Sequence, residues 1–104
     1  MHRVVVHNDL VFVGGTVADD LSVGLEGQTE QILTKFNQYL SAVGTDKSRL
    51  LSATIFLTDL SRKPEMDAAW KRWLAPKDFP ARATVGVADL GEDTLVEIII
   101  TAAR

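Results

Sequence analysis

The amino-acid sequence predicts an α+β fold, in which two helices cover one face of a mixed β-sheet. Two kinds of segment carry this prediction: five short runs of apolar and β-branched residues, and two longer segments whose apolar residues recur at helical spacing. Their order along the chain is β-β-α-β-α-β-β, which describes a two-layer sandwich. The length of 104 residues fits a single domain over residues 1–104.

The first two strands are predicted to form a hairpin. Residues 4–6 and 10–13 are apolar, and Asn8-Asp9 between them tolerates the left-handed conformations of a tight turn. Gly14-Gly15 is expected to end the second strand, and the polar residues 16–24 are expected to form a loop.

The two helices follow from the spacing of apolar residues. The first is predicted over residues 25–43, where apolar side chains fall mostly on one stripe and Gly44 follows at the end. The second begins near Pro64, because proline suits the first turn of a helix. Its apolar residues share one face: Met66, Trp70, Trp73 and Leu74.

Three further strands complete the sheet, over residues 50–60, 82–88 and 95–103, with a turn at 89–94. The strands at 50–60 and 95–103 carry apolar residues on both faces, whereas two helices can cover only one. An open aliphatic face would forfeit about 25 cal/mol per Å² of apolar surface and invite aggregation. We therefore expect another copy of the chain to cover the second face, in a homo-oligomer.

Composition excludes several classes of function. The chain has 11 Lys and Arg against 14 Asp and Glu, a net charge of −3, so we expect no nucleic-acid partner held through the phosphate backbone. The absence of cysteine excludes disulfides and thiolate chemistry. His2 and His7 lie five residues apart and are expected on opposite faces of a strand, so we predict no metal site and no cofactor.

The same sequence gives an expectation for location. Its aliphatic runs are far shorter than the ~20 residues of a membrane span. The first residues carry no apolar core of signal-peptide length. We therefore expect a cytoplasmic protein that makes no membrane contact.

Few polar residues are candidates for chemistry. Arg82 opens a strand, where its guanidinium could hold a carboxylate through two hydrogen bonds or lie in solvent. Glu97 interrupts an aliphatic strand and either orients a water, binds a ligand, or serves as an exposed or ion-paired strand residue. Gly14-Gly15 permits close approach of a ligand to the backbone, or serves only as a turn. The basic residues around the second helix are expected to form a solvated face: Lys63, Lys71, Arg72 and Lys77.

Several segments together resemble the RidA family, also called YjgF/YER057c/UK114. The resemblance rests on residues 52–59, 66–70, 79–85 and 95–98, and its most specific part is the Pro80-x-Arg82 strand followed fifteen residues later by Glu97. It implies a chorismate-mutase-like fold. It also implies a homotrimer whose sheets pack into a central barrel, with three clefts between subunits.

The resemblance also implies an activity, the hydrolysis of reactive enamines and imines to 2-keto acids and ammonia. In that scheme Arg82 clamps the substrate carboxylate, Glu97 helps position the attacking water, and the backbone at Gly14 and Gly15 lines the cleft. Two further cleft positions depart from the family pattern. Thr84 stands where cysteine is frequent, and Asp67 stands where an asparagine approaches the cleft. The short N-terminal region is similar to that of a shorter subgroup of the family.

The leading hypothesis is therefore a homotrimeric deaminase that acts on small 2-imino or enamine acids. The alternative is a non-catalytic trimer that binds or senses a small carboxylate metabolite through the same cleft. A third alternative, RNA cleavage, is a label attached to the family. The acidic balance and the lack of a well-placed histidine count against it.

Overall fold

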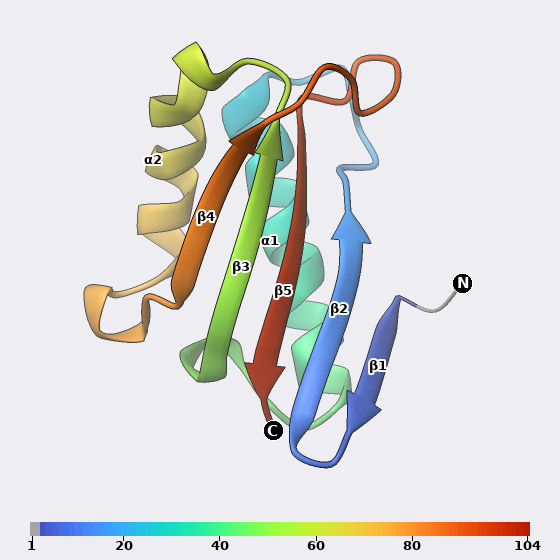
Figure 1. Cartoon of the computed structure of the whole chain (residues 1–104), viewed down its shortest axis with the longest axis vertical. Coiled ribbons are helices and arrows are strands. Elements are labelled where there is room, and N and C mark those ends of the chain that lie inside the picture. The colour runs from blue at the N-terminus through green and yellow to red at the C-terminus, as the bar shows by residue number, and fades with distance from the viewer. Residues whose placement is uncertain (1–2) are drawn as a thin grey trace.

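Both helices lie against one face of a five-stranded sheet in the computed structural model, which describes residues 3–104 (Figure 1). The sheet order is β1-β2-β5-β3-β4, and every neighbouring pair is antiparallel except β3 and β4. The elements are β1 (Val4–His7), β2 (Leu10–Thr16), α1 (Leu25–Ala42), β3 (Leu50–Leu57), α2 (Lys63–Trp73), β4 (Ala81–Gly86) and β5 (Val96–Ala103). This architecture confirms the predicted α+β class and element order.

Two strand ends differ from the prediction by three residues, and the other strand boundaries differ by at most two. The second strand does not end at Gly14-Gly15 but runs through both glycines to Thr16, with an irregular register between Val13 and Thr16. The third strand ends at Leu57 rather than at residue 60. Its end has a local cause, because the Asp59 side chain accepts a hydrogen bond from the backbone N–H of Ser61 at 3.0 Å and begins a short 3₁₀ turn.

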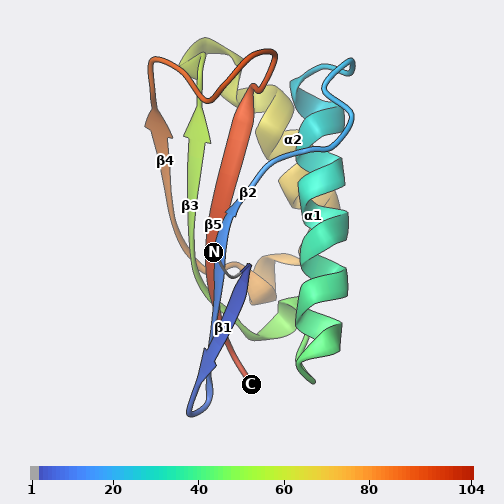
Figure 2. The same ribbon diagram turned by 90° about the vertical axis from the view of Figure 1, so that its right-hand side faces the viewer.

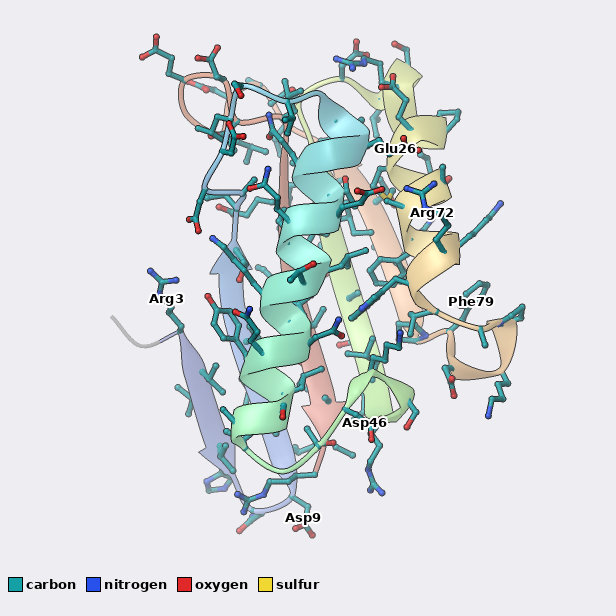
Figure 3. All side chains as sticks on the ribbon, turned by 180° about the vertical axis from the view of Figure 1, so that it is seen from behind. Arg3, Asp9, Glu26, Asp46, Arg72 and Phe79 are labelled. Atoms are coloured by element: carbon teal, nitrogen blue, oxygen red, sulfur yellow. The ribbon has the colours of Figure 1, made fainter. Side chains whose placement is uncertain are left out.

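The core fills the space between the sheet and the two helices. Its largest fully buried side chains come from both layers, including Phe36 of α1, Met66 of α2 and Ile55 of β3. At the solvent side of the helix pair, Glu26 of α1 and Arg72 of α2 point toward one another and form an ion pair at 3.3 Å (Figure 3). Burial of the apolar stripe thus fixes both helices on the same face of the sheet.

A buried glutamine joins α1 to the loop that leads into β5. Gln28 is fully buried, and its amide nitrogen donates to the backbone carbonyls of Val23 and Asp93, each at 3.0 Å. Its amide oxygen accepts from the backbone N–H of Leu95 at 3.0 Å. Because Leu95 directly precedes β5, this set of three hydrogen bonds anchors the start of that strand.

The other face of the sheet carries no element of the described chain, as Figure 2 shows. Large apolar side chains on that face are exposed, namely Val5, Phe12, Val85 and Ile99 at 38–48%. The expectation that two helices cover only one face is therefore confirmed. Within residues 3–104, no helix combines the length and apolar character needed to cross a membrane.

Candidate functional site

Arg82 lies near the start of β4 and faces α2, and it is not a solvated residue at a strand end. Its Nη2 donates to Oδ1 of Asp67 at 2.8 Å, and its Cζ lies 5.5 Å from the centroid of the Trp70 ring. The Arg82 side chain is only 22% exposed. An ion pair on one edge and an aromatic face below hold the guanidinium in one orientation.

Asp67 is shared between two cations. Its second oxygen, Oδ2, accepts from Nζ of Lys63 at 2.6 Å, one helical turn earlier on α2. Burial alone would raise the pKa of Asp67, but the hydrogen bonds from Lys63 and Arg82 outweigh burial and hold that pKa below its ordinary value. The Asp67 carboxyl is therefore ionised at neutral pH.

A hollow of about 330 Å³ opens over this group of side chains. Its walls include the Arg82–Asp67 pair and two aromatic residues, Trp70 and Phe79. Phe79 lies in the segment between α2 and β4 on the helix side of the molecule, where the residue is 45% exposed (Figure 3). Lys63 and Lys71 complete the lining, so the hollow combines a fixed guanidinium, one carboxylate and an apolar wall.

Glu97 lies on the opposite face of the sheet. In the register it stands opposite Phe56, which in turn stands opposite Val85 of β4. Arg82 is three residues before Val85, and side chains alternate between faces along a strand, so the two predicted catalytic residues point to opposite sides. A single chain therefore does not bring Arg82 and Glu97 into one cleft.

Gly15 makes room for the Glu97 carboxylate. A Cβ atom at Gly15 would lie 3.0 Å from both Cδ and Oε2 of Glu97. This contact favours glycine at position 15, because a larger residue would displace the glutamate side chain that lies over the strand. The lack of a side chain at Gly15 thus leaves space for Glu97, and Gly15 lies within β2 and not in a turn.

Three predicted site residues remain, Gly14, Gly15 and Thr84. Gly14 and Gly15 line a separate hollow of about 380 Å³ at the end of β2, where Arg3 donates to the Tyr39 hydroxyl at 2.9 Å. Thr84 shares the face of Arg82, two residues further along β4, and stands opposite Ile55 in the register.

Two residues beside Arg82 were not predicted as part of the site. Lys63 was expected on a solvated helix face, but it contacts Asp67. Trp70 was expected as a core or interface residue, but its ring also lies against Arg82. The spacing of Lys63, Asp67 and Trp70 along one helix, at steps of four and three residues, is the signal that could have joined them.

Comparisons with known proteins give a consistent result. A sequence profile described as Endoribonuclease L-PSP matches residues 1–104. A RutC family protein from Haemophilus ducreyi is 38% identical over 101 residues, which cover 97% of this chain and 86% of that protein. Reactive Intermediate Deaminase A, chloroplastic, from Arabidopsis thaliana is 33% identical over 97 residues, which cover 88% of this chain and 51% of that protein. A solved structure of a YjgF family member from Neisseria meningitidis has a TM-score of 0.92 at 33% identity and covers 98% of this chain and 85% of that one.

Proposed function

The chain belongs to the Endoribonuclease L-PSP family and is similar to RutC and YjgF family proteins, and we propose that it hydrolyses small reactive 2-imino acids. The products are the 2-keto acid and ammonia. The observation that carries the proposal is the immobilised Arg82 guanidinium at a partly apolar hollow. A relative of similar sequence bears the name of a reactive-intermediate deaminase, which agrees with this choice.

The proposed reaction requires the protein mainly to position the substrate and a water molecule. The carbon of a C=N bond is already electrophilic, so water adds to it, and the resulting carbinolamine loses ammonia to leave the ketone. Arg82 would hold the carboxylate of the substrate through its free N–H groups. Glu97 would orient the water, accept its proton and return that proton to the nitrogen that leaves as ammonia. Placement of both reactants would supply most of the rate acceleration.

We further propose that each cleft combines Arg82 of one chain with Glu97 of another copy. Support comes from their position on opposite faces of the sheet, because no single chain can present both to one ligand. Support also comes from the exposed apolar face around Glu97, which needs a cover. A ring of three chains whose open faces meet at the centre, as in the trimer that the family resemblance implies, would cover that face and create three such clefts.

RNA cleavage, the activity in the family description, has less support. The net charge of −3 gives the chain no excess of cations for a phosphate backbone. His7, which lies exposed at the end of β1, stands outside both groups of candidate residues. His2 lies outside the described residues.

The activity is tested by following imine decay while an amino-acid oxidase generates 2-imino acids in the presence of the purified protein. We expect the wild type to accelerate decay and Arg82→Ala to lose the acceleration by about 100-fold or more, because the substrate carboxylate loses its anchor. Arg62→Ala is the matched control, since Arg62 forms an ion pair with Glu65 outside the hollow.

Two results would contradict the proposal. One is wild-type protein that accelerates the decay of no imino acid. The other is an acceleration that Arg82→Ala leaves intact. Binding of 2-keto acids that requires Arg82 but occurs without turnover would instead favour the alternative, a trimer that binds small carboxylates.

Gly15→Ala tests the part assigned to Glu97. The added methyl would push the flexible end of the Glu97 side chain and no backbone atom, so we expect the melting temperature to stay close to that of the wild type. The displaced carboxylate should lower the rate of imine hydrolysis about tenfold or more. Gly24→Ala is the control, because its nearest neighbour would lie at 3.9 Å. Equal activity in all three proteins would remove Glu97 from the mechanism.

A further inference from the structure

We infer that Asp67 and Arg82 form a two-charge recognition site, in which Arg82 binds the carboxylate of the ligand and Asp67 accepts a hydrogen bond from the nitrogen on the adjacent carbon. The site would then select α-iminium and α-ammonium acids over 2-keto acids of the same size. This inference rests on the proposed function and specifies that the site recognises the nitrogen next to the substrate carboxylate.

The first argument is the hydrogen-bonding capacity that the pair retains. An arginine carries five N–H donors, and Asp67 occupies one of those on Arg82. The others suffice for a two-point contact with a ligand carboxylate. An ionised carboxylate has about four acceptor positions, of which Lys63 and Arg82 occupy one each. Asp67 can therefore accept another hydrogen bond without losing either partner.

The second argument is geometric. Oδ1 of Asp67 and a ligand carboxylate oxygen would accept from neighbouring N–H groups of the same guanidinium, which places the two oxygens about 5 Å apart. The nitrogen of a 2-imino acid is bonded to the carbon next to the carboxylate, so it lies beside that ligand oxygen and can face Asp67. A 2-keto acid puts a carbonyl oxygen at the same place, where two acceptors would repel each other.

The third argument is charge. Lys63 contacts the second oxygen of Asp67 at 2.6 Å and offsets its negative charge, so the three side chains together keep one positive charge for the ligand carboxylate. Asp67 is 18% exposed and lines the hollow beside Arg82. Its low pKa, set by Lys63 and Arg82 against the effect of burial, keeps it an acceptor at neutral pH. If Asp67 served only to neutralise the charge of Arg82, the contact with Lys63 would not be needed.

The experiment compares two stable probes with one carbon skeleton, 2-aminobutanoate and 2-oxobutanoate, by calorimetry or ligand-observed NMR. We expect the wild type to bind the amino acid more tightly. In Asp67→Asn the ratio of the two affinities should fall about tenfold, because a charge-assisted hydrogen bond to the nitrogen is lost. Glu65→Gln is the matched control, since it removes an arginine-paired carboxylate from the same helix outside the hollow. Asp67→Ser serves as a second variant if Asp67→Asn does not fold.

The outcomes separate this inference from the proposed activity. Loss of the preference in the Asp67 variant that folds supports the inference whether or not the protein hydrolyses imines. An unchanged ratio overturns it, even if the wild type is an active deaminase. Tighter binding of both probes in Asp67→Asn also overturns it, because Asp67 would then be a competitor for Arg82. Failure of the wild type to bind either probe contradicts it as well.

Discussion

Mixed oligomers of Arg82→Ala and Glu97→Gln chains are expected to regain imine hydrolysis that neither variant has alone. Each variant keeps one of the two residues, and the residues lie on opposite faces of a chain. In a ring of three chains that contains both variants, one of three clefts combines an intact Arg82 with an intact Glu97, so about one third of the wild-type activity should return. Co-expression with two different affinity tags and purification on both isolates the mixed rings.

The recovered fraction also reports the size of the assembly. A twofold dimer with two shared clefts would restore about one half, because one of its two clefts would be intact. Mixed oligomers as inactive as each parent variant would show that the cleft does not draw these residues from different chains. Co-expression of Arg82→Ala with itself under two tags supplies the background for the comparison.

Gln28→Glu is expected to destabilise the folded chain by about 3 kcal/mol near pH 8, the largest stability effect we predict for a single polar substitution. Gln28 is fully buried, and its amide nitrogen donates to two backbone carbonyls. An ionised carboxyl there would face both carbonyl oxygens without a proton to share. Urea denaturation at one fixed protein concentration measures the difference.

The loss should depend on pH in a defined direction. Burial raises the pKa of the introduced carboxyl in the folded state above its unfolded value of about 4.3. The folded variant then binds more protons than the unfolded one between these two values, so its deficit grows as pH rises and shrinks as pH falls to about 4. Gln38→Glu on the exposed side of α1 is the control and should show little of this dependence. A deficit that is the same at both pH values would contradict the assignment of a buried charge.

The fold followed from periodicity because the spacing of apolar residues reports burial directly. The Met66 and Trp70 face of α2 and the alternation in β5 both reappear as buried surfaces. The boundaries depended on individual side chains. The end of β3 at Leu57 depends on the Asp59 cap, and the continuation of β2 to Thr16 depends on its pairing with Ile98 of β5. The first contact joins close neighbours that the apolar spacing does not report, and the second joins residues far apart in sequence.

The strand pattern and the family resemblance predict Arg82, Glu97 and Asp67 as site residues, but not the contacts between them. The resemblance places Asp67 at a cleft position, and neither it nor the strand pattern indicates that Asp67 pairs with Arg82. The contact exists because β3 and β4 are parallel, so the chain between them must cross over the sheet, and α2 makes that crossing beside β4. The opposite directions of Arg82 and Glu97 required the register of three strands.

The exposed apolar face of the sheet makes the stability of the folded chain depend on the concentration of whatever binds to that face. Whatever covers Phe12, Val85 and Ile99 binds the folded chain and not the unfolded one, so it stabilises the fold in proportion to the logarithm of its free concentration. If the cover is another copy, abundance and stability rise and fall together. At a low cellular concentration, a larger fraction of the chains would then be unassociated. Those chains would unfold more readily and be more susceptible to proteolysis.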